Sequence, residues 1–154
     1  MKEKLQEYAL LAEIISAFAV VITLLILIVE VRENTDTLKT SSYQSQLEKF
    51  NGWREVMLLE QQNMDIFLLY SQGKIPDQGT SEYIRLNFIL STLWGNYDSA
   101  YASFKSGMFE DNEWNRIKVS MCLEYETMHD RKIEDIVYLR ISSDLIKYIE
   151  SECS

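Results

Sequence analysis

The apolar residues of this chain are distributed unevenly, and the longest apolar run lies near the N-terminus. Residues 14–29 form 16 consecutive positions without a charge, a proline or a glycine. Extended to residues 9–31, the stretch covers 23 positions and holds only Glu13 and Glu30, each near one end. At about 1.5 Å per residue, such a helix spans roughly 34 Å, which matches a bilayer core of about 30 Å. The pattern predicts a transmembrane helix over 9–31 after a short N-terminal tail, residues 1–8.

Two other structures share this pattern, and the flanking residues weigh against both. A cleaved signal peptide would use Lys2 and Lys4 as its positive region, but no small-x-small cleavage site follows the apolar run. A buried helix of so small a soluble domain is rarely apolar on every face. The positive residues after the run, Arg32, Lys39 and Lys49, exceed those before it by one. That margin predicts a cytoplasmic C-terminal domain.

The remaining residues, 32–154, predict an all-α domain: an aromatic-rich bundle of about four further helices. Apolar positions up to Leu68 recur mostly at steps of three and four, so we expect the membrane helix to continue, with a bend near Gly52. Residues 71–80 hold two glycines and the only proline of the chain, which predicts a loop.

The second half of the chain predicts three or four shorter helices. Thr80 or Ser81 is expected to cap a helix over about 81–106, with Gly107 as its stop. Another helix should open after residue 111 or 112, and a break at Ser142 and Ser143 should divide residues 131–152 into two. The expected buried stripe of the 81–106 helix is Ile84, Phe88, Trp94, Tyr97, Tyr101 and Phe104, widened by Leu86, Ile89, Leu90 and Leu93.

Small and polar residues of the membrane span fall on one line along the helix. They recur at alternating steps of three and four, at Ala9, Ala12, Ser16, Ala19, Thr23, Ile26 and Glu30. Small residues let two helix backbones approach closely, which predicts a self-association seam and hence a homo-oligomer in the lipid bilayer. The line continues as Glu33, Thr37, Thr40 and Gln44.

The same stripe also fits a pore, and we keep that alternative open. In a ring of four to six copies, Ser16 and Thr23 would be wettable and Ile26 would form a constriction. Glu30 would then form an acidic ring that favours cations. Glu13 lies off the stripe, about one turn inside the apolar run. An intramembrane carboxylate is costly and can indicate a functional site. We favour the alternative that Glu13 marks the membrane interface, where headgroup water solvates it.

Composition narrows the chemistry that the chain can perform. The 154 residues carry 24 acidic and 15 basic side chains, a net charge of −9, so we expect no nucleic-acid partner. One histidine and two cysteines are too few for a zinc finger or an iron–sulfur module. Cys122 and Cys153 could pair, but free thiols in a reducing cytosol are equally natural.

Candidate catalytic and binding motifs are weak. Glu126-x-x-His129 has the spacing of a metal-ligand pair, with Cys122 one turn earlier, but a di-iron bundle needs two such pairs. We expect His129 to lie near a helix C-terminus instead. There is no Gly-x-Ser-x-Gly elbow and no glycine-rich phosphate loop, so we expect neither an enzyme nor a cofactor. One aromatic set could line a pocket but is more typical of core packing: Trp53, Trp94, Tyr97, Tyr101 and Trp114.

A short motif resembles a group of small bacterial membrane proteins of no assigned activity. In that group an N-terminal membrane helix runs into an aliphatic-x-x-x-Arg-x-Asn-Thr segment and then a helical domain rich in Trp and Phe. Arg32, Asn34 and Thr35 stand at the matching positions within residues 25–44. The resemblance implies bacterial origin, membrane insertion and a helical domain; it implies no chemistry. From the sequence we therefore expect a membrane-anchored scaffold, sensor or accessory subunit, or alternatively a small cation channel.

Overall fold

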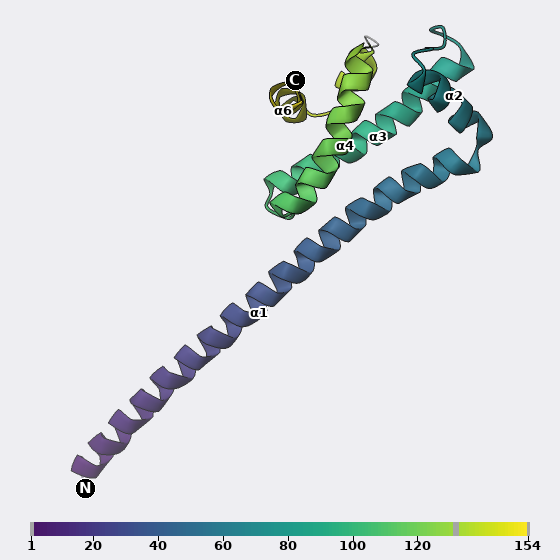
Figure 1. Cartoon of the computed structure of the whole chain (residues 1–154). Coiled ribbons are helices and arrows are strands. Elements are labelled where there is room, and N and C mark those ends of the chain that lie inside the picture. The colour runs from purple at the N-terminus through teal and green to yellow at the C-terminus, as the bar shows by residue number, and fades with distance from the viewer. Residues whose placement is uncertain (1, 131–132, 154) are drawn as a thin grey trace. The chain divides into compact units, whose positions relative to one another are not determined.

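The structure, a computed structural model, describes residues 2–130 and 133–153, and all regular secondary structure in them is α-helical. This confirms the predicted all-α class. The chain divides after Thr40 into two compact units, of which the second holds most of the helices (Figure 1). The helices are α1 (Lys2–Leu59), α2 (Gln61–Ser71), α3 (Ser81–Lys105), α4 (Asp111–Asp130), α5 (Glu134–Tyr138) and α6 (Ser143–Glu152).

The first unit is a single stretch of α1. It forms because residues 2–40 contain no proline or glycine, so no residue interrupts the backbone hydrogen bonds. The helix already includes the residues expected as an N-terminal tail, from Lys2 onward. Every side chain from Leu11 to Leu38 is exposed in this unit. The apolar surface of the helix is therefore available to lipid or to another helix.

Helix α1 is interrupted later than the bend that was predicted near Gly52. Gly52 is inside the helix, which ends at Leu59, and Glu60 adopts an extended backbone conformation. The Asn63 side chain donates to the Val56 carbonyl over 3.2 Å, so it satisfies one of the last carbonyls of α1. The cost of a helical glycine, about 1 kcal/mol, is small enough for packing on α3 to override.

The predicted loop and helix ends of α3 are confirmed. Gly73 and Gly79 take the left-handed conformation between α2 and α3, at φ of 81° and 91°. The Thr80 hydroxyl accepts from the Tyr83 amide over 3.1 Å and caps α3. Gly107 ends the helix at φ 74°, where its amide donates to the Phe104 carbonyl.

Helices α4 and α6 begin close to the predicted positions, whereas α5 covers only Glu134–Tyr138 of the helix expected from residue 131, and residues 131–132 lie outside the described residues. Glu113 accepts from the Glu110 amide over 2.9 Å, which makes half of a capping box at the start of α4. Ser142 caps α6 by accepting from the Leu145 amide. The Ser142 amide and hydroxyl both donate to the Asp98 carboxylate, so α3 holds the start of α6 in place.

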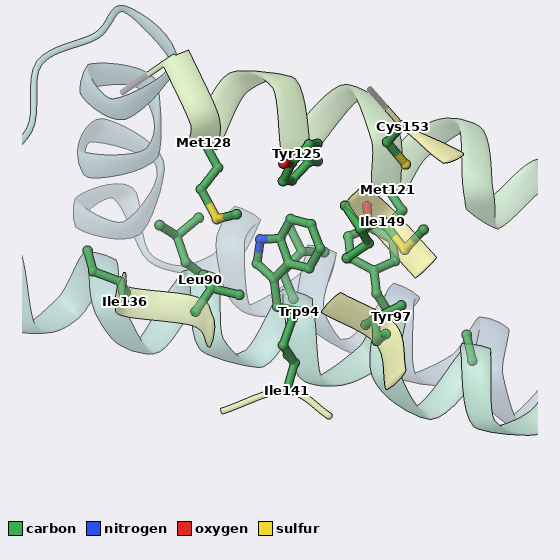
Figure 2. Close-up of a cluster of buried hydrophobic side chains, with 14 of the residues drawn as sticks. Leu90, Trp94, Tyr97, Met121, Tyr125, Met128, Ile136, Ile141, Ile149 and Cys153 are labelled. Carbon is green, nitrogen blue, oxygen red and sulfur yellow. The ribbon is translucent and has the colours of Figure 1, made fainter. Parts of the chain in front are cut away.

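Helix α3 lies at the centre of the second unit and contacts α2, α4 and α5. Figure 2 shows Trp94 packed between Met128 and Tyr125 of α4 on one side and Ile141 on the other. The buried side of α3 differs in part from the predicted stripe, because Ile84 and Phe88 are 51% and 61% exposed. Its buried residues are Leu86, Ile89, Leu90, Leu93, Trp94, Tyr97 and Ala100.

Candidate functional site

From Ala12 to Glu30, the predicted membrane stripe lies on the exposed surface of the first unit. Within the described residues, α1 is the one helix long and apolar enough to cross a membrane, and none of its apolar window is buried. Glu13 is exposed on the same helix. The exposed stripe residues are Ala12, Ser16, Ala19, Thr23, Ile26 and Glu30.

The threonines of the stripe already use their hydroxyl protons. Thr23 donates to the Ala19 carbonyl over 2.8 Å, and Thr37 and Thr40 donate to Glu33 and Asp36 in the same way. Such bonds to the preceding turn satisfy the donor without a partner helix. Each hydroxyl oxygen can still accept a hydrogen bond from a neighbouring donor or bind a cation.

In the second unit, a row of polar side chains joins the last part of α1 to α3. Gln46 is 2% exposed; its amide donates to the Asn96 carbonyl over 2.7 Å and accepts from the Ser99 hydroxyl over 3.3 Å. Lys49 donates to the same hydroxyl. The Trp53 indole donates to the Ile89 carbonyl over 3.2 Å. These bonds set the register of α1 on α3, since a shift of either helix would break all of them.

An apolar groove lies at the end of this row. It has a volume of about 540 Å³ and is lined by α1, α2 and α3, among others by Val56, Ile84 and Phe88. Arg85 at its rim is paired with Glu60 over 2.8 Å and with the Asn63 side chain over 3.0 Å. The groove explains the exposure of Ile84 and Phe88, which the sequence alone assigned to the core.

Three members of the aromatic set pack in the core, as the sequence favoured. Trp94, Tyr97 and Trp114 are at most 3% exposed. Trp114 stacks on Phe104 at 5.0 Å between ring centroids, and its indole donates to the Tyr148 hydroxyl over 2.9 Å. The Trp94 indole nitrogen is buried without a partner among the described residues. Such a donor destabilises the fold by roughly 1–3 kcal/mol.

Of the residues considered for a metal site, Cys122 and His129 have other partners. Cys122 forms a disulfide with Cys153, and the two Cα atoms lie 5.0 Å apart. His129 lies in the last turn of α4, as expected, and stacks on the Tyr125 ring. Among the described residues no group of three or more potential metal ligands occurs. The bond between α4 and α6 is a feature that the sequence left open.

Comparisons with protein-family models, with curated proteins and with solved structures give no match to this chain.

Proposed function

We propose that this chain is a membrane-anchored protein that self-associates through α1 and presents the helical second unit as a scaffold, sensor or accessory subunit. The observation that carries the proposal is the uninterrupted exposed apolar surface of residues 14–29. Twelve of these residues are Leu, Ile, Val or Phe. On a biological insertion scale they favour the membrane by about 4–7 kcal/mol. Exposed to water, the same surface would promote aggregation.

Self-association is proposed from the small residues on one side of that helix. Ala12, Ser16 and Ala19 lie at steps of four and three, so one face lacks the bulky side chains found elsewhere on the span. Close backbone approach on such a face strengthens dispersion contacts between helices in lipid. Because the Thr23 hydroxyl proton is already used, dispersion rather than interhelical hydrogen bonding supplies most of the contact energy.

The test is a pair of matched variants in the full chain in nanodiscs or liposomes. Ala19→Leu places a bulky side chain on the seam, and Ala17→Leu makes the same change at nearly the same depth on another face. Energy transfer between labelled copies should fall strongly for Ala19→Leu and stay unchanged for Ala17→Leu. Equal transfer in the two variants would contradict the proposed seam.

A cation channel is the second candidate, supported by the polar continuation of the stripe. The exposed hydroxyl oxygens of Thr23, Thr37 and Thr40 can accept hydrogen bonds or bind cations, and Glu30 adds an exposed carboxylate where the apolar run ends. In a ring these groups would favour cations over anions. Glu30→Gln should then lower the cation-to-anion permeability ratio in bilayer recordings, whereas Glu13→Gln, off the stripe, should not. An absence of conductance in the unmodified protein removes this candidate.

The proposed location is a bacterial plasma membrane, with a single span. The flanking positive charges favour a cytoplasmic second unit by one residue. The Cys122–Cys153 bond favours the other side, since disulfides persist mainly in oxidising compartments. Alkylation of intact cells before lysis, followed by mass spectrometry, distinguishes these two orientations. Two alkylated thiols support the cytoplasmic side, and an intact bond supports the opposite orientation.

A further inference from the structure

The second unit, residues 41–154, has another cavity between α1, α3 and α4. It is smaller and more polar than the apolar groove. Its volume is about 360 Å³, which is the size of sites that hold small organic molecules. Two arginines from different helices line it, Arg54 from α1 and Arg116 from α4. Apolar and aromatic side chains, including Tyr43 and Phe50, line it as well. The cavity thus combines positive charge with an apolar wall.

Neither of the two arginines is held in an ion pair among the described residues. The ion pairs in that part of the chain use Arg85, Lys105 and Lys118. Both side chains, Arg54 and Arg116, are exposed, and a bound anion at the cavity they line would accept charge-assisted hydrogen bonds from their guanidinium groups.

Neutral hydroxyls complete the polar part of the cavity. The Tyr97 hydroxyl lies 3.0 Å from the Ser120 hydroxyl, and both residues line the space. Burial raises the pKa of Tyr97, so its phenol stays a neutral hydrogen-bonding group at physiological pH. The Phe50 and Tyr97 rings lie 5.3 Å apart, which gives the cavity an aromatic wall for a flat ligand.

We propose that this cavity binds a small organic anion, a carboxylate or a phosphate carried on an apolar or aromatic body. Arg54 and Arg116 would hold the anionic group by forked hydrogen bonds, and the aromatic wall would pack against the apolar body. The positive lining disfavours metal cations and amines. The site lies wholly within the second unit and therefore does not depend on the membrane function proposed for α1.

The probe is phenyl phosphate, titrated calorimetrically into the full chain held in neutral phosphatidylcholine nanodiscs. Arg54→Gln and Arg116→Gln each remove one guanidinium group, and we expect each to weaken binding about tenfold. Arg140→Gln is the matched control: it removes the same charge from an exposed residue that packs over the Phe88 ring instead. Far-UV circular dichroism checks that the variants are folded. Benzyl alcohol, a neutral analogue, should bind at least tenfold more weakly than the phosphate.

The outcomes separate the cavity from a general charge effect and identify the source of the anion. Loss of affinity in both cavity variants but not in Arg140→Gln supports the proposal. No binding to the unmodified chain, equal weakening in all three variants, or equal binding of the neutral analogue overturns it. Nanodiscs that contain phosphatidic acid then distinguish two sources of the same phosphate chemistry. If the lipid displaces phenyl phosphate, the ligand is a lipid headgroup; if it does not, the ligand is a soluble anion.

Discussion

The disulfide between α4 and α6 supports a quantitative prediction about the stability of the helical unit. Cys122 and Cys153 are separated by 31 residues, and the bond closes that segment into a loop in the unfolded chain. The entropy of a closed loop of this length corresponds to about 3.5–4 kcal/mol at 25 °C. Opening the bond should therefore lower the free energy of unfolding by about that amount.

The folded state itself should change little when the bond opens. Leu145 and Ile149 of α6 are fully buried, and Trp114 of α4 donates to the Tyr148 hydroxyl. These contacts keep α6 docked without the covalent link. The loss of stability thus comes mainly from the greater entropy of the unfolded chain.

The assay is thermal unfolding of the full chain in mild detergent, followed by tryptophan fluorescence with and without a phosphine reductant. All three tryptophans lie in the helical unit, so the signal reports its unfolding. A loss of about 3.5–4 kcal/mol should lower Tm by roughly 10–20 °C in a unit of this size. The Cys122→Ser/Cys153→Ser double variant should melt at the reduced temperature and ignore the reductant. A reductant-induced shift below about 3 °C in the unmodified chain would refute the reasoning.

Three further predictions concern the same unit. Ile149→Ala, at a fully buried site, should cost about 2–5 kcal/mol, whereas Leu139→Ala, at a side chain that is 89% exposed, should change stability by about 0.5 kcal/mol or less in urea unfolding. Thr80→Ala removes the cap of α3 and should cost about 1 kcal/mol; a value near zero would show that the cap is dispensable. The hydrogen bond from Lys105 lowers the pKa of Asp144 below its usual 3.8, so the pair stabilises the folded state above about pH 4 and loses that effect as the pH falls through the lowered pKa. Because Asp144 raises the pKa of Lys105 above 10.5, the effect is also lost at strongly alkaline pH; Tm of Lys105→Gln and of the unmodified chain should converge at both extremes.

Three helix ends of the second unit were predictable because they depend on local chemistry. Thr80, Gly107 and Ser142 act within a few residues of their own position, through cap bonds or a left-handed backbone. Such signals can be read from the sequence without knowledge of the tertiary structure. The break at Glu60 has no comparable signal, since it depends on the Asn63 side chain bonding back to Val56.

The buried side of α3 was only partly predictable, because this helix is apolar on more than one side. Leu86 and Leu90 face the core, whereas Ile84 and Phe88 line the groove. Periodicity alone placed Ile84 and Phe88 on the main buried stripe, with Leu86 and Leu90 only widening it. The contacts of α3 with α4 and α5 decide between them, and those contacts are between residues distant in sequence.

The remaining features of the site depend on long-range placement. Gln46 bonds to Asn96, and Arg54 and Arg116 line one cavity from two helices. Cys122 meets Cys153 only because α6 packs against α4. Polar residues such as Gln46 look like solvent-facing positions in the sequence. Only the fold brings them to a buried helix seam.

The measurement that tests the central claim most directly is the mass of the particle that the unmodified chain forms in nanodiscs, by native mass spectrometry. Self-association through α1 predicts a discrete multiple of 18.1 kDa that persists on dilution and is lost in Ala19→Leu. A monomer at every protein concentration would contradict both the seam and the pore, because each requires more than one copy of α1.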